Sequence, residues 1–174
     1  FIYGGYATLS LGYIGIYEAT VLTKHCSHTA PEGRKFAMRI MDDLNTHIKK
    51  WRKETNIGFA LYGTPAENLT NLFCKIDKAR FGSIPDVTDK GYYTNSYHVD
   101  VREPINVFDK FSFEADFEDK STGGCISYAE IPNMTHNIPA VLTMVQYIYD
   151  HITYGEFNTK LDYCHECGFD GEII

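Results

Sequence analysis

The chain has 174 residues, of which 44% are hydrophobic, and this suits one domain with a sizeable core. Its formal net charge is −7, which argues against a general nucleic-acid-binding surface, because such surfaces depend on clustered positive charge. No run approaches the roughly 20 apolar residues of a membrane span. The apolar beginning lacks the basic residues of a signal peptide, so the chain is predicted to be cytoplasmic.

The first half of the chain is predicted to form a strand, a helix and a second strand. Strand formers occupy residues 6–11, and a glycine-rich turn then leads into a short helix near Glu18. Thr29 opens a Thr-Xaa-Xaa-Glu start signal for a long amphipathic helix. Its apolar residues recur every three or four positions, at Phe36, Ile40, Leu44, Ile48 and Trp51. A short apolar strand at 59–61 completes a βαβ-like unit, which predicts parallel neighbours in a sheet or barrel.

The stretch 58–69 changes from a strand pattern to a helix start within twelve residues. Thr64 suits the N-cap, Pro65 the first helical position, and Glu67 the third, so a capping box is predicted. The same residues also describe an anion site, since unpaired amides at the positive end of a helix lie beside the flexible Gly63. Local chemistry favours the cap and leaves the anion site open.

The second half begins with a polar segment at 89–100, in which seven of twelve residues are Tyr, Thr, Asn, Ser or His. Such side chains suit a pocket for a sugar, although Tyr and Thr are also ordinary strand residues. Residues 103–122 are predicted to be a loop with a solvated acidic patch, and residues 123–130 a strand. A last helix at 140–151 is apolar on most sides and is predicted to be buried.

The five cysteines are an odd number in a domain of ordinary size, so reduced thiols are expected rather than a disulfide-stapled fold. Cys74 is predicted to be a small core residue. Cys164 and Cys167, followed by Gly168, have the spacing of a zinc knuckle, but tetrahedral zinc needs four ligands and only half a site is present. A redox dithiol is the rival reading.

Four segments, in this order, resemble successive motifs of the anaerobic, class III ribonucleoside-triphosphate reductases. They are residues 5–15 (GYATLSLGYIG), 62–68 (YGTPAEN), 89–96 (DKGYYTNS) and 164–168 (CHECG). The resemblance implies an α/β fold, the second half of a ten-stranded α/β barrel of the glycyl-radical type. Residues 1–160 would form a partial catalytic barrel domain, and residues 161–174 the first half of a zinc ribbon.

The resemblance also implies an activity, cofactors and partners. Enzymes of this family reduce ribonucleoside triphosphates to deoxyribonucleoside triphosphates by glycyl and thiyl radical chemistry, with formate as the reductant. A radical S-adenosylmethionine activating protein installs the glycyl radical, and the parent enzyme is expected to be a homodimer. No direct nucleic-acid binding and no membrane association are expected.

Site residues follow from the matching positions. Tyr62 and Glu67 are expected to face the substrate as catalytic residues. The expected substrate-binding residues are Gly63, Thr64, Pro65, Ala66, Tyr92, Thr94, Asn95 and Ser96. Thr64 and the helix amides after it would hold triphosphate oxygens, and Cys164 with Cys167 would supply half of the zinc site.

Five parts of the family pattern are missing from the 174 residues: the Arg-Xaa-Cys-Gly-Tyr radical motif, the thiyl cysteine, the second cysteine pair, the N-terminal allosteric region and the first half of the barrel. The chain is therefore predicted to be a fragment that does not reduce ribonucleotides by itself. The alternative is a non-catalytic zinc-binding or interaction module that completes its tetrahedron by pairing two chains.

Overall fold

The computed structural model describes residues 1–159 and 162–171, which hold five helices and six strands. In chain order these elements are β1 Thr8–Tyr13, α1 Ile16–Lys24, α2 Pro31–Thr55, β2 Gly58–Gly63, α3 Asn68–Phe81, α4 Val107–Glu118, β3 Ser127–Ile131, α5 Ile138–His151, β4 Gly155–Thr159, β5 Asp162–Tyr163 and β6 Asp170–Gly171. No helix among the described residues is long and apolar enough to cross a membrane.

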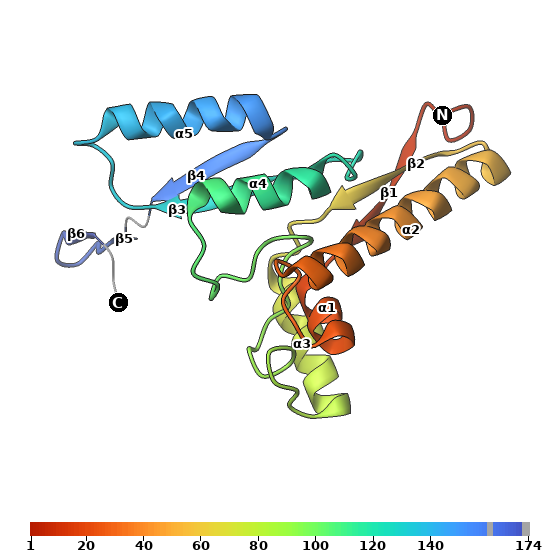
Figure 1. Ribbon diagram of the computed structural model, residues 1–174, viewed down its shortest axis with the longest axis horizontal. Helices are drawn as coiled ribbons and strands as arrows, with labels where there is room; N and C mark the ends of the chain where they lie inside the picture. The colour runs from red at the N-terminus through yellow and green to blue at the C-terminus, as the bar shows by residue number, and fades with distance from the viewer. Residues whose placement is uncertain (160–161, 172–174) are drawn as a thin grey trace.

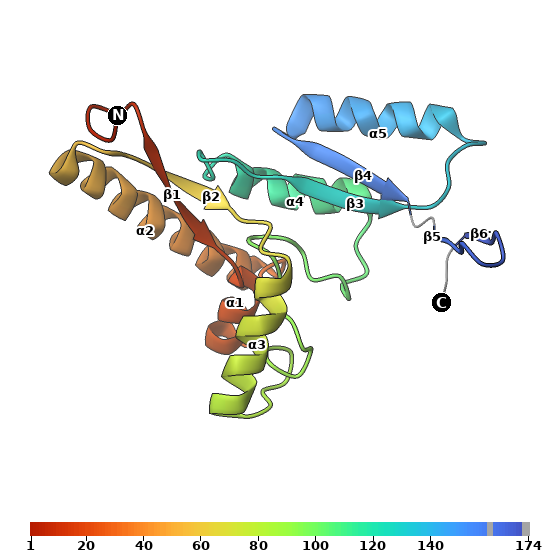
Figure 2. The same ribbon diagram turned by 180° about the vertical axis from the view of Figure 1, so that it is seen from behind.

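Strands β1 and β2 form the predicted parallel pair, with α1 and α2 in the connection between them. The register runs from Thr8 opposite Gly58 to Tyr13 opposite Gly63. Helix α2 lies along the strand pair, and the carboxyl ends of both strands point toward α1 and α3 (Figures 1 and 2). The strand, helix and strand order therefore gives the parallel arrangement that the spacing predicts.

The main core lies between α2, β2, α4 and the segment before α4. Its most buried side chains include Met41 from α2, Leu61 from β2, Tyr97 from the segment before α4, and Phe117 from α4. The predicted apolar stripe of α2 faces this core, since Ile48 is buried and its neighbours along the stripe are partly buried. Cys74 is also fully buried, as predicted.

Helix α2 has its N-cap one residue later than predicted. Ala30 is the N-cap residue and makes no side-chain cap, while Pro31 occupies the first helical position. The Thr29 hydroxyl instead donates a hydrogen bond of 2.7 Å to Glu103. The Thr29 hydroxyl, predicted to cap the helix, is thus bound to the carboxylate of Glu103, which is distant in sequence.

The predicted loop at 103–122 is wrong, because most of it is α4. Asn106 caps this helix by accepting hydrogen bonds from the amides of Phe108 and Asp109. The acidic residues expected in a solvated turn include Glu114 and Glu118, which are 0% and 4% exposed. They are buried because each carboxylate accepts hydrogen bonds from segments packed against α4.

A second parallel pair, β3 and β4, follows, with α5 as its crossover. Ser127 of β3 lies opposite Gly155 of β4. The prediction that α5 is buried on most sides is wrong: Met144 is its buried residue, whereas Leu142 and Tyr149 are more than half exposed. Helix α5 packs Tyr147 and Ile148 against α4 and the two-stranded pair, and most of its other large apolar side chains are exposed.

Candidate functional site

The candidate site lies where β1 and β2 end. Strand β1 leads through Gly15 into α1, and β2 leads through residues 64–67 into α3. A third segment, residues 92–96, crosses the same edge. In parallel α/β folds, ligands bind outside the carboxyl ends of the strands, so this edge is the place to look for a site.

The loop 64–67 does not form the predicted capping box. Helix α3 begins at Asn68, and Glu67 stands before it with a left-handed φ of 43° and without a side-chain cap. The Thr64 hydroxyl donates to the Tyr62 carbonyl, at 3.3 Å. The predicted reciprocal bonds are absent because the chain makes an extra turn between Thr64 and α3, and Glu67 is left exposed.

The amides of this turn are unequally satisfied. The Ala66 amide donates a hydrogen bond of 2.9 Å to Oδ1 of Asn95. The amides of Leu69 and Thr70 donate to carbonyls within the turn. In the part of the chain that the structure describes, no acceptor receives the amides of Glu67 or Asn68. Two free donors thus remain at the positive end of α3, where an anion is favoured.

The segment 92–96 is fastened to both neighbouring helices. Its Tyr93 amide donates to the Thr70 carbonyl of α3 at 3.2 Å, and the Tyr93 hydroxyl donates to Asp77 at 2.8 Å. On the other side, the Thr94 carbonyl accepts a hydrogen bond of 2.8 Å from the Gly15 amide, just before α1. The segment therefore has a fixed path across the strand ends.

A cavity of about 160 Å³ opens beside this segment. Its walls include four of the segment's residues, Tyr92, Tyr93, Thr94 and Asn95. The remaining walls are Thr70, His98, Val99, Val101, Lys110 and Tyr128. Three of the predicted binding residues, Tyr92, Thr94 and Asn95, thus line one cavity.

The other predicted binding residues lie elsewhere around the same edge. Ser96 is 1% exposed, and its hydroxyl has no hydrogen-bond partner among the described residues. Tyr62, Gly63 and Thr64 lie at the end of β2, and Pro65 is exposed in the turn. The Asn95 contact with the Ala66 amide joins the two groups.

Close packing at the strand ends explains two glycines in the motifs. A Cβ on Gly12 would lie 2.1 Å from the Thr64 hydroxyl, and one on Gly63 would lie 3.0 Å from the Tyr97 ring. The Gly63 amide also donates to the Gly124 carbonyl at 3.0 Å. These glycines let the backbones and Thr64 approach one another closely.

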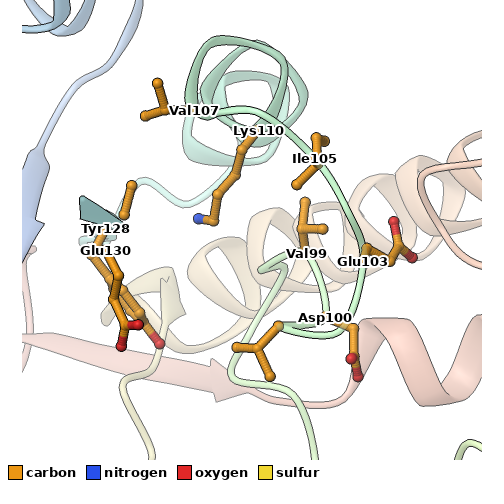
Figure 3. Close-up of a pocket in the computed structure, with 10 residues that line it drawn as sticks. Val99, Asp100, Glu103, Ile105, Val107, Lys110, Tyr128 and Glu130 are labelled. Atoms are coloured by element: carbon orange, nitrogen blue, oxygen red, sulfur yellow. The ribbon is translucent and has the colours of Figure 1, made fainter. Parts of the chain in front are cut away.

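Lys110 of α4 is a functional candidate that sequence reasoning missed. Its side chain points into an adjoining cavity of about 200 Å³, which shares Val99, Val101, Lys110 and Tyr128 with the first (Figure 3). The missed signal was the Asn-Xaa-Xaa-Asp start at Asn106, which marks a helix and places Lys110 one turn before Glu114.

Glu114 forms an ion pair with Lys110 and a hydrogen bond with His98. Its Oε1 lies 2.6 Å from the Lys110 Nζ and 3.3 Å from Nδ1 of His98. Burial raises the pKa of the Glu114 carboxyl, but His98 and Lys110 outweigh burial and bring this pKa to about 2. The site therefore contains an ionised carboxylate beside the Lys110 ammonium.

The C-terminal cysteines lie in a turn between β5 and β6. The Cys164 amide donates to the Phe169 carbonyl at 2.9 Å, and the Gly168 amide donates to the Cys164 carbonyl at 2.8 Å. The Cys167 amide and thiol lower the pKa of the Cys164 thiol, which favours a metal-binding thiolate. Two cysteines can supply two of the four ligands of tetrahedral zinc, and the described residues include no group of three or more His, Cys, Asp or Glu that could hold a metal.

These observations define an α/β protein with parallel strand pairs and a cavity beside the segment that crosses the carboxyl ends of one pair. Comparison with known proteins gives the family. The family model described as anaerobic ribonucleoside-triphosphate reductase matches residues 2–174. The chain is 45% identical over 171 residues to the anaerobic ribonucleoside-triphosphate reductase of Escherichia coli, and 43% identical over 169 residues to that of Enterobacteria phage T4.

These alignments cover 97% of the chain but 24% and 26% of the two relatives, so the chain spans about a quarter of their length. A solved structure, the Thermotoga maritima anaerobic ribonucleotide reductase in complex with dATP and CTP, matches with a TM-score of 0.75. Its sequence identity is 21%, over 93% of this chain and 27% of that one. The chain belongs to the anaerobic ribonucleoside-triphosphate reductase family.

Proposed function

We propose that the chain supplies part of the nucleotide-reducing domain of an anaerobic ribonucleoside-triphosphate reductase. The loop 64–67 and the first amides of α3 would hold triphosphate oxygens, while Tyr92, Thr94 and Asn95 line the space for the rest of the nucleotide. Tyr62 and Glu67 would face the reacting sugar. The substrate would be a ribonucleoside triphosphate, like the CTP named for the Thermotoga maritima complex.

One observation carries this proposal: the hydrogen bond from the Ala66 amide to Asn95. It joins two motif segments that are 29 residues apart in the chain. The joint lies at the carboxyl ends of parallel strands, beside the free amides of Glu67 and Asn68. Polyanion binding at such a helix start needs backbone donors and the helix dipole rather than a cluster of basic side chains, which suits an acidic chain.

The proposal extends to the barrel, the zinc ribbon and the cofactors of the complete enzyme. Residues 1–160 would be part of a ten-stranded barrel, and residues 161–174 would begin a zinc ribbon in which Cys164 and Cys167 supply two of four thiolates. In the complete enzyme, the glycyl radical installed by the activating protein would generate the thiyl radical that abstracts hydrogen from the nucleotide. Formate would supply the reducing equivalents. The 174-residue chain alone would be inactive, because the sequence lacks the radical motif and the thiyl cysteine.

Replacing Thr64 with alanine is expected to weaken ribonucleoside-triphosphate binding. The variant loses one hydroxyl donor to a charged phosphate oxygen, which corresponds to a roughly tenfold higher dissociation constant. Calorimetry with CTP and ATP, on the full-length protein that contains this sequence, measures the effect.

The matched control is Thr46→Ala on the exposed face of α2, where the hydroxyl donates to the Asp42 carbonyl. This variant should bind both nucleotides as the unmodified protein does. Equal affinity in Thr64→Ala would remove Thr64 from the proposed site, and no nucleotide binding by the unmodified protein would overturn the proposed function.

A further inference from the structure

A buried ion triad lies behind the candidate site and is not explained by nucleotide binding. The Lys90 Nζ lies 2.6 Å from Oε1 of Glu18 and 2.5 Å from Oδ2 of Asp100. The three side chains are at most 4% exposed. The ammonium also lies over the rings of Tyr17 and Tyr92, 4.4 and 4.7 Å from their centroids, where cation–π attraction adds to the ion pairs.

The triad is balanced in charge by a fourth residue. Nε of Arg102 donates to Oδ1 of Asp100 at 2.9 Å, so two cations face two carboxylates. Burial lowers the pKa of Lys90, but its bonds to Asp100 and Glu18 outweigh burial and raise it, so the ammonium stays charged. Removing such ions from water costs free energy that their attraction barely recovers, and stability alone is a poor reason for the arrangement.

The triad fixes the path of the cavity-lining segment through Glu18. The same oxygen that binds Lys90 accepts hydrogen bonds of 2.8 Å from both the amide and the hydroxyl of Thr94. The other oxygen, Oε2, is buried and has no partner among the described residues. All of the hydrogen bonds that orient this carboxylate therefore come from Lys90 and Thr94.

Thr94 in turn determines where Asn95 points. The Thr94 and Ser96 carbonyls accept the amides of Gly15 and Ile16, so the backbone on both sides of Asn95 is fastened to the start of α1. The Asn95 side chain accepts the Ala66 amide of the loop before α3, and it also hydrogen-bonds to Tyr128.

We propose that the Glu18, Lys90 and Asp100 triad is a positioning element for the loop at the start of α3. Through Thr94 it holds Asn95 against the Ala66 amide, and so sets the orientation of the free amides that follow. Glu18 and Lys90 act through other residues and do not touch the nucleotide. The inference rests on the proposed function for its ligand, but the positioning itself is a property of the protein alone.

Hydrogen exchange of the Ala66 amide tests the proposal directly. In the complete polypeptide, Glu18→Gln removes the charge at nearly constant shape, and Asn95→Ala removes the acceptor. Both variants should speed exchange at Ala66 by roughly tenfold or more and weaken CTP binding, and the double variant should show no further change in either. An unchanged Ala66 exchange rate in Glu18→Gln, with faster exchange in Asn95→Ala, would overturn the proposal.

Two further variants keep the test decisive. If Glu18→Gln fails to fold, Thr94→Val removes the hydroxyl that bonds both Glu18 and Lys90 and should also speed exchange at Ala66. An unchanged rate would count against the triad. Glu54→Gln, in the exposed pair with Lys50 on α2, is the charge-matched control and should leave Ala66 unaffected. If the unmodified protein binds no CTP, the proposed function fails, whereas the exchange rates still decide the positioning role.

Discussion

Replacing Lys90 with methionine is expected to destabilise the protein by about 3–5 kcal/mol, because it leaves the Glu18 and Asp100 carboxylates buried without their shared cation. Methionine keeps most of the side-chain volume, so packing loss is a minor part of the effect. Arg102 still binds Asp100, which leaves Glu18 as the more poorly compensated charge. Urea denaturation of the variant and the unmodified protein measures the difference.

The control for this prediction is Lys50→Met on α2, where the ammonium lies 3.7 Å from Glu54 and 63% of the lysine side chain is exposed. Exposed pairs contribute about 0–1 kcal/mol, so this variant should unfold almost as the unmodified protein does. Adding Glu18→Gln to Lys90→Met should recover part of the lost stability, since it removes the uncompensated charge. A Lys90→Met protein of unchanged stability would contradict the description of the triad.

Replacing Gly33 with alanine is expected to destabilise the protein by about 3 kcal/mol, although alanine is the better helix former by roughly 1 kcal/mol. Gly33 lies in the first turn of α2, and a Cβ there would come within 2.0 Å of the Ser27 carbonyl oxygen and 2.9 Å of the His28 Cα. Both contacts are with backbone, so a side-chain rotation cannot relieve them. Thermal or urea unfolding gives the sign directly.

The comparison for Gly33 is Ser112→Ala, an exposed position within α4. There the helix preference acts without a steric contact, and the change should be neutral or slightly stabilising. A stabilised Gly33→Ala protein would mean that the chain before α2 does not pass as close to the helix as described.

The parallel β1 and β2 pair could be predicted from sequence because local pattern and chain connectivity agree there. Apolar runs, a long amphipathic helix and the spacing between strands leave little choice of topology. Helix α4 was missed because its buried carboxylates look like a solvated acidic patch. Burial of these carboxylates is favourable because of partners distant in sequence, such as the Thr153 amide that binds Glu118. A local sequence pattern does not indicate such contacts.

The geometry of the candidate site could not be predicted from the sequence. The capping box at Thr64 and Glu67 satisfied every local rule, yet Asn95, from a segment 29 residues away, takes the Ala66 amide instead. Similarly, nothing near Lys90 in the sequence shows that Glu18 and Asp100 will surround it. Family resemblance located residues 62–68 and 89–96, and the structure shows the hydrogen bond that joins them.

We propose above that the start of α3 and the segment 92–96 together form a triphosphate site. Amide hydrogen exchange of the complete polypeptide, with and without saturating CTP, tests it most directly. We expect CTP to slow exchange at the Glu67 and Asn68 amides, which have no acceptor among the described residues. Bound CTP that leaves these two amides unprotected would contradict it.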